Sequence, residues 1–128
     1  AARMDKAILV YEGGESMRFD YHAINEGING CLRLMHSFDM ISFEVPGNVP
    51  VKIISDTWVR SHSSGLFHMN QVNGAHVLKD DLLGVICDPF GETMEQIVSP
   101  IDGYIVGINN MPVVNEGDAL IHLGTDHK

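Results

Sequence analysis

The stretch Val114-Asn115-Glu116-Gly117-Asp118-Ala119-Leu120 decides the fold of the second part of this chain, because its pattern occurs twice. Its key positions Val114, Asp118 and Leu120 are preceded, 37 residues earlier, by Val77, Asp81 and Leu83. A second pattern is also repeated: Val59, Ser61 and Gly65 recur 38 residues later as Ile97, Ser99 and Gly103. Each glycine is expected to permit a tight strand bend, and each aspartate a turn that reverses the chain. The sequence therefore predicts two copies of one β-unit.

Short β-rich runs surround these repeated positions, and they begin after a Pro-, Gly- and Asn-rich boundary at residues 46–50. Strands are predicted at residues 51–54, 57–60, 65–69, 82–87, 95–98, 103–108 and 119–123. We expect an all-β domain over residues 51–124, with its two halves facing each other as a small flattened barrel.

Residues 57–124 resemble the biotinyl/lipoyl-like barrel-sandwich hybrids, whose hairpins commonly read Val-x-x-Gly-Asp-x-Leu. A carrier of this kind needs an exposed lysine in the hairpin between its halves, where the cofactor is joined through an amide. The matching segment, residues 87–95, contains no lysine, and Lys52 and Lys79 lie elsewhere. The sequence therefore argues against a covalent biotin or lipoyl carrier.

The first part of the chain follows another pattern. Residues 7–11 are apolar and predict a buried strand, which leads directly into Glu12 and two glycines. Asp20 is a suitable N-cap for a helix, and apolar side chains then follow at helical spacing from Ile24 to Met35. One strand and one helix cannot bury both faces of the strand, so we expect this part, residues 1–45, to belong to a larger sheet.

The composition of the chain limits the classes of partner that it is expected to bind. The net charge is -9, and the eight Lys and Arg residues are scattered, which argues against nucleic acid. No apolar run approaches the ~20 residues that span a membrane, so no membrane association is expected. Two cysteines, Cys31 and Cys87, make no disulfide framework and are expected as buried free thiols, which favours a cytoplasmic location.

Taken together, these segments resemble the C-terminal portion of the succinylglutamate desuccinylase/aspartoacylase family, in particular its predicted deacylase branch. The resemblance is carried by Glu12-x-Gly14 after the apolar run, by the segments 12–20 and 84–92, and by 112–120, and it spans residues 6–124. It implies an α+β, mainly β chain. A strand-loop-helix remnant of a zinc carboxypeptidase-like α/β domain would precede a barrel-sandwich hybrid β-domain.

The resemblance also implies a zinc-dependent deacylase that hydrolyses the amide bond of an N-acyl amino acid or a related small molecule. Glu12 matches the carboxylate that takes the proton of water and passes it to the leaving amine; Glu15 is the alternative, although its register does not match Glu-x-Gly. Such enzymes take their zinc ligands from a His-x-x-Glu pair and a later His. These are absent here, so we expect them upstream of this chain, with no zinc and no activity in the fragment alone.

Substrate contacts follow less directly. Where the family places an aromatic hydroxyl, this chain has Asn110 and Met111, and a methionine cannot donate the same hydrogen bond. Arg60 and His62 are further candidates, with a solvated edge of the β-domain as the competing interpretation. A homo-oligomer is compatible with the unpartnered strand and helix. The alternative function is a non-catalytic barrel-sandwich interaction or carrier-like module.

Overall fold

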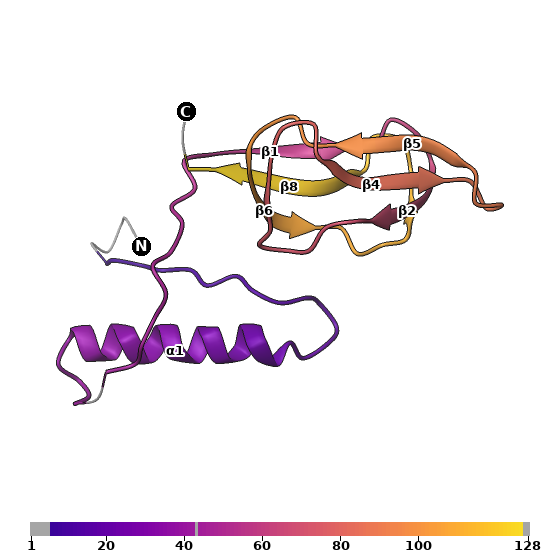
Figure 1. Cartoon of the computed structure of the whole chain (residues 1–128). Coiled ribbons are helices and arrows are strands. Elements are labelled where there is room, and N and C mark those ends of the chain that lie inside the picture. The colour runs from indigo at the N-terminus through magenta and orange to yellow at the C-terminus, as the bar shows by residue number, and fades with distance from the viewer. Residues whose placement is uncertain (1–5, 43, 127–128) are drawn as a thin grey trace. The chain divides into compact units, whose positions relative to one another are not determined.

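The computed structural model describes residues 6–42 and 44–126, and the chain divides into two compact units, residues 1–49 and 50–128. Unit 1 contains helix α1 (Tyr21–Ser37) and no strand among its described residues. Unit 2 contains eight strands among its described residues, and Figure 1 labels β1, β2, β4, β5, β6 and β8. The strands are β1 (Ser55–Arg60), β2 (Gly65–Met69), β3 (His76–Val77), β4 (Leu82–Cys87), β5 (Thr93–Val98), β6 (Gly103–Ile108), β7 (Val113–Val114) and β8 (Ala119–Thr125). A mainly β chain with one helix confirms the predicted α+β class.

Helix α1 begins where the sequence predicts. The side chain of Asp20 accepts a hydrogen bond from the amide of Ala23 at 3.1 Å, which satisfies one of the free N–H groups of the first turn. Ala23 is the one buried residue of the helix. The predicted apolar side is not covered, since Ile24 is 39% and Ile28 is 52% exposed.

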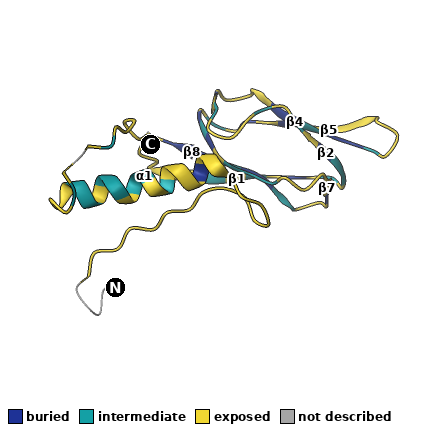
Figure 2. Ribbon diagram, turned by 90° about the horizontal axis from the view of Figure 1, so that it is seen from below, coloured by how far each residue is buried: buried dark blue, intermediate teal, exposed yellow. Residues whose placement is uncertain are grey.

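The predicted strand at residues 7–11 does not form. This segment is irregular, and Ile8, Leu9 and Val10 are 62%, 82% and 76% exposed (Figure 2). A strand needs a neighbour to pair its backbone groups, and no other described segment of unit 1 is extended beside it. Tyr11 is the residue that holds the segment to α1: its hydroxyl donates to the carbonyl oxygen of Ala23 at 2.6 Å, and its ring lies over Gly27, where a Cβ would come within 2.9 Å of it.

Unit 2 consists of two antiparallel four-stranded sheets, with strand orders β1-β8-β6-β3 and β5-β4-β2-β7. The internal repeat explains this topology. Residue spacings of 37 and 38 relate β1 to β5, β2 to β6, β3 to β7 and β4 to β8. Replacing each strand of the first sheet by its counterpart in the other repeat gives the strand order of the second sheet. The two sheets thus correspond to each other under the spacing of the predicted repeat. The core between the sheets is apolar, and Leu83, Ile86, Leu120, Ile121 and Leu123 have no exposed surface.

Hydrogen bonds at the turns repeat in the same way. Asp81 accepts from the amide of Leu78 at 2.7 Å, and Asp118 accepts from the amide of Asn115 at 2.8 Å. The predicted role of these aspartates in reversing the chain is thus confirmed. The two repeated glycines do something different from the predicted bend: a Cβ on Gly103 would lie 2.5 Å from the carbonyl oxygen of Gly124, so the absence of a side chain lets two strands approach closely.

Other differences are local. Residues 51–54, predicted as a strand, are irregular, although the amide of Ile54 donates to the carbonyl oxygen of Thr125 at 2.8 Å. The short strands β3 and β7 were not predicted, because two residues carry too little pattern to be recognised. Both cysteines are free, as predicted, but only Cys87 is buried, because Cys31 faces outward from α1. No helix among the described residues is long and apolar enough to cross a membrane.

Candidate functional site

Glu12 lies in the irregular segment of unit 1 that precedes α1. It is exposed, and its carboxylate makes no hydrogen bond or ion pair with any residue of the described part. Gly14 follows with a positive φ of 82°, which a residue with a side chain rarely adopts. Glu15, the alternative carboxylate, is occupied by an ion pair at 3.4 Å with the guanidinium of Arg18. Of the two, Glu12 is therefore the carboxylate left available to a ligand or a water.

The structure brings Asn110 and Met111 together at a pocket of about 440 Å³ in unit 2, which we call the Asn110 pocket. Two connections meet there, 70–75 between β2 and β3 and 109–112 between β6 and β7, and these are corresponding parts of the two repeats. Phe67 is buried at its base, and Met69 and Ile108 are half-buried. The complete lining is Phe67, Met69, Gln71, Val72, Asn73, Ile108, Asn109, Asn110, Met111 and Pro112.

Two of the amides in this pocket are structural. Nε2 of Gln71 donates to the carbonyl oxygen of Leu82 at 3.0 Å, and Nδ2 of Asn109 donates to that of Ala119 at 3.2 Å. Oδ1 of Asn109 also accepts from the amide of Met111 at 2.9 Å, which fixes the connection that carries both predicted substrate residues. The repeat could have identified this pair from the sequence, because Gln71 and Asn109 are 38 residues apart.

Arg60 does not line the Asn110 pocket. Its Nη1 instead donates to the carbonyl oxygen of Gly117 at 2.8 Å, at the turn before β8. This contact fits the competing interpretation of Arg60 as part of an edge of the β-domain, because the guanidinium is used to hold a turn.

His62 is held by a cluster that the sequence did not predict. The carboxylate of Glu95 accepts from the backbone amide of His62 at 3.2 Å, from Nδ1 of His62 at 2.9 Å and from Oγ of Ser63 at 2.7 Å. Burial alone would raise the pKa of Glu95, but the hydrogen bonds from Ser63 and His62 lower it below its ordinary value. Ser63 donates to the carboxylate and not to the imidazole, so this is an anchor for the loop after β1 and not a nucleophile with its base.

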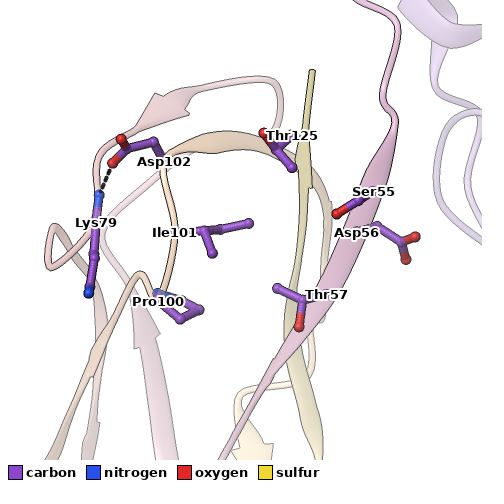
Figure 3. Close-up of a pocket in the computed structure, with 8 residues that line it drawn as sticks. All are labelled: Ser55, Asp56, Thr57, Lys79, Pro100, Ile101, Asp102 and Thr125. Carbon is purple, nitrogen blue, oxygen red and sulfur yellow. Dashed lines mark hydrogen bonds between the residues drawn. The ribbon is translucent and has the colours of Figure 1, made fainter. Parts of the chain in front are cut away.

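The corresponding place in the other repeat is a pocket of about 500 Å³ (Figure 3). Thr57 occupies the position of Glu95, while Pro100 and Ile101 occupy those of His62 and Ser63. The carboxylate of Glu95 and its donors thus have no counterpart in this repeat. The loop that carries Pro100 and Ile101 and the strand that carries Thr57 are separated by the pocket. Lys79 and Asp102 meet at one side, where the amide of Lys79 donates to Oδ1 of Asp102 at 2.6 Å. We call this the Lys79 pocket; Ser55, Asp56 and Thr125 complete its lining.

Two further observations bear on the predicted zinc chemistry and on the carrier alternative. No three His, Cys, Asp or Glu side chains within residues 6–42 and 44–126 lie close enough together to hold a metal ion. The described residues therefore do not fit a zinc site. The hairpin 88–92 between the two repeats presents Phe90, which is 93% exposed, at the place where a carrier would need its lysine.

The fold is similar to parts of several solved structures. The ectoine utilization protein EutE (DoeB) from Ruegeria pomeroyi matches with a TM-score of 0.71 and 20% identity, over 84% of this chain and 36% of that protein. The succinylglutamate desuccinylase/aspartoacylase from Rhodobacter sphaeroides matches with a TM-score of 0.68 and 18% identity, over 86% and 37%. A succinylglutamate desuccinylase from Silicibacter sp. TM1040 gives 0.69 and 18%, over 84% and 34%.

This chain spans about a third of the length of the solved structures that it matches. Unit 2 holds less than two thirds of the chain, so each match also includes residues of unit 1. No family model and no curated protein matches the chain in sequence. The chain therefore has the fold of one part of the succinylglutamate desuccinylase/aspartoacylase family structures, as its sequence predicts.

Proposed function

We propose that this chain is the C-terminal portion of a deacylase that hydrolyses the amide bond of an N-acyl amino acid or a related small molecule. The observation that carries the proposal is the similarity in fold to desuccinylase/aspartoacylase structures over more than four fifths of the chain. The exposed apolar residues of unit 1 support it. Leu9 and Phe19 are both 82% exposed, and side chains of this kind are ordinarily covered by further protein.

In this proposal Glu12 is the general base and acid. A carboxylate with no partner of its own can take a proton from the attacking water and deliver it to the leaving nitrogen. Gly14, with a φ of 82°, lets the backbone turn two residues after Glu12 and leaves the exposed carboxylate uncovered. Unit 2 would be a barrel-sandwich hybrid domain that contributes Asn110 and Met111 to the substrate contacts.

The described residues do not fit a metal site, so the proposal places the zinc ligands outside this chain. Two His and one Glu preceding Ala1 would hold it, and this chain alone would bind none. The non-catalytic alternative gains no support, because the hairpin that a carrier would modify has Phe90 and no lysine.

The test is amide hydrolysis by the longer protein that carries this chain. Released amine is measured with a panel of N-acyl amino acids, before and after chelation, and after zinc is returned. We expect turnover that disappears on chelation and reappears with zinc, while the 128-residue chain alone releases no amine. Absence of turnover with every substrate, in a protein that carries the upstream ligands, would contradict the proposed function.

A further inference from the structure

The Asn110 pocket differs from the rest of this acidic chain in its charge. None of its ten lining residues is ionisable: six are apolar and four carry a neutral amide. The Lys79 pocket, in contrast, is lined by a lysine and two aspartates. A carboxylate that enters the Asn110 pocket would therefore lose water without gaining a cationic partner, which is unfavourable.

The polar groups at the rim of the Asn110 pocket suit a particular neutral group. Each of its two connections carries one apolar and one amide side chain at its tip, Val72 with Asn73 and Asn110 with Met111. Within the described residues, the side-chain amides of Asn73 and Asn110 make no hydrogen bond. Each can donate through its NH₂ and accept through its carbonyl oxygen, which is the complement of a secondary amide.

The apolar base of the pocket sets what lies beyond that amide. Phe67 is 7% exposed and Met69 and Ile108 are half-buried, while Met111 at the rim is 64% exposed. An alkyl chain placed over these side chains would remove apolar surface from water on both partners. A pocket of about 440 Å³ has room for such a chain and its amide, within the range of small-molecule sites.

We propose that the Asn110 pocket binds the neutral, apolar acyl group of a secondary amide and discriminates against acyl groups that end in a carboxylate. The proposal rests on the proposed function for the choice of an acyl amide as ligand. Asn73 and Asn110 would hold the amide, and Phe67, Met69 and Ile108 would contact the acyl chain. The substrate class of the deacylase would then be amides with neutral acyl groups, and not succinylated compounds.

The test compares two ligands that differ at one end only. N-butyrylglycine methylamide and N-succinylglycine methylamide each carry a four-carbon acyl group, which ends in a methyl in the first and in a carboxylate in the second. Each is titrated into the isotope-labelled chain at pH 7, and backbone amide resonances are followed by NMR. We expect saturable shifts at residues 67–73 and 108–112 with the butyryl compound. The succinyl compound should bind at least about tenfold more weakly, a difference of about 1.4 kcal/mol.

A charge at the rim should reduce this preference. Met111→Lys supplies the cation that the pocket lacks, so the affinity of the succinyl compound should rise relative to that of the butyryl compound, by up to about fivefold for an exposed ion pair. Met94→Lys is the matched control, because Met94 is a similarly exposed methionine, 56%, on β5 and does not line the pocket. It should leave the preference of the unmodified chain in place.

Several results would overturn the inference: no saturable shift with the butyryl compound, equal affinity for the two ligands, shifts that map to the Lys79 pocket, or an unchanged preference in Met111→Lys. Failure of the proposed function looks different. A longer protein that hydrolyses no amide, together with selective butyryl binding here, would reject the deacylase and retain the pocket. A longer protein that hydrolyses amides, together with no selective butyryl binding here, would retain the deacylase and reject the ligand assigned to the pocket.

Discussion

At the scale of single residues, one carboxylate is used for structure and another is left free. Glu95 is only 16% exposed and accepts three kinds of hydrogen bond from His62 and Ser63, whereas Glu12 has no partner in the described part of the chain. The sequence pointed to Glu12 through the residues on either side of it. It gave no indication of Glu95, because His62 and Glu95 are 33 residues apart and meet only when the first repeat faces the second.

Glu95→Gln tests the structural carboxylate. At pH 7 we expect the free energy of unfolding to fall by about 1 to 3 kcal/mol, because hydrogen bonds to a charged acceptor are lost from a mostly buried site. Urea unfolding followed by far-UV circular dichroism measures the change. Glu92→Gln, on the hairpin before β5, is the control and should stay within about 0.5 kcal/mol of the unmodified chain.

The pH dependence of the same variant has a definite sign. The pKa of Glu95 is lowered in the folded chain, so its ionised form favours folding. This contribution is fully present above the unfolded value of 4.5 and is lost as the pH falls through the folded pKa. The difference in unfolding free energy between unmodified chain and Glu95→Gln should therefore shrink towards pH 3. A difference that is the same at pH 7 and pH 3 would show that the ionised hydrogen bonds are not its cause.

At the scale of elements, the sequence predicted what local pattern specifies. The Asp20 cap and the 3.6-residue period placed α1, and β2, β4 and β6 have the predicted bounds. Prediction failed where the outcome depends on a neighbour. Residues 7–11 have the composition of a strand and remain irregular for want of a paired edge, while β3 and β7 exist because β6 and β2 lie beside them.

The glycines of the repeat allow neighbouring strands to approach each other closely. In Gly103→Ala, the new Cβ would lie 2.5 Å from the backbone oxygen of Gly124, which cannot move without displacing β8. We expect a loss of about 1 to 3 kcal/mol in unfolding free energy. Gly107→Ala lies in the same strand, with its nearest neighbour at 3.4 Å, and should cost clearly less. Equal losses in a thermal unfolding series would contradict this explanation of the glycine.

The candidate site was predictable to a smaller extent than the fold. The sequence offered Asn110 and Met111 as substrate contacts, which stays a prediction, and it gave no sign of the pocket that they line together with Phe67 and Asn73 from the other repeat. Such a pocket arises from the meeting of two corresponding connections, and only the folded arrangement brings them together.

At the scale of the whole molecule, the two units differ in how they are stabilised. Unit 2 has a core of ten buried apolar residues between its sheets, whereas Ala23 is the one buried apolar residue of the described part of unit 1. Hydrophobic burial is the main source of folding free energy, so unit 2 should be stable by itself.

A shortened chain of residues 50–128 tests this difference. We expect it to unfold cooperatively, with a Tm within a few degrees of that of the whole chain, and to keep the amide NMR resonances of the β-strands. A shortened chain without a cooperative transition would show that unit 1 is required for the core of unit 2.

The central claim is that Glu12 supplies the proton-transfer group of an amide hydrolase. The most direct measurement is kcat for amide hydrolysis by the longer protein with Glu12→Gln, beside Glu15→Gln as the matched control and with the zinc content of each variant determined. We predict that Glu12→Gln lowers kcat by about 10²-fold or more with zinc content unchanged, because general acid and base catalysis contributes about 10² to 10⁴-fold, while Glu15→Gln stays within a few-fold. A Glu12→Gln variant within a few-fold of the unmodified enzyme would contradict the claim.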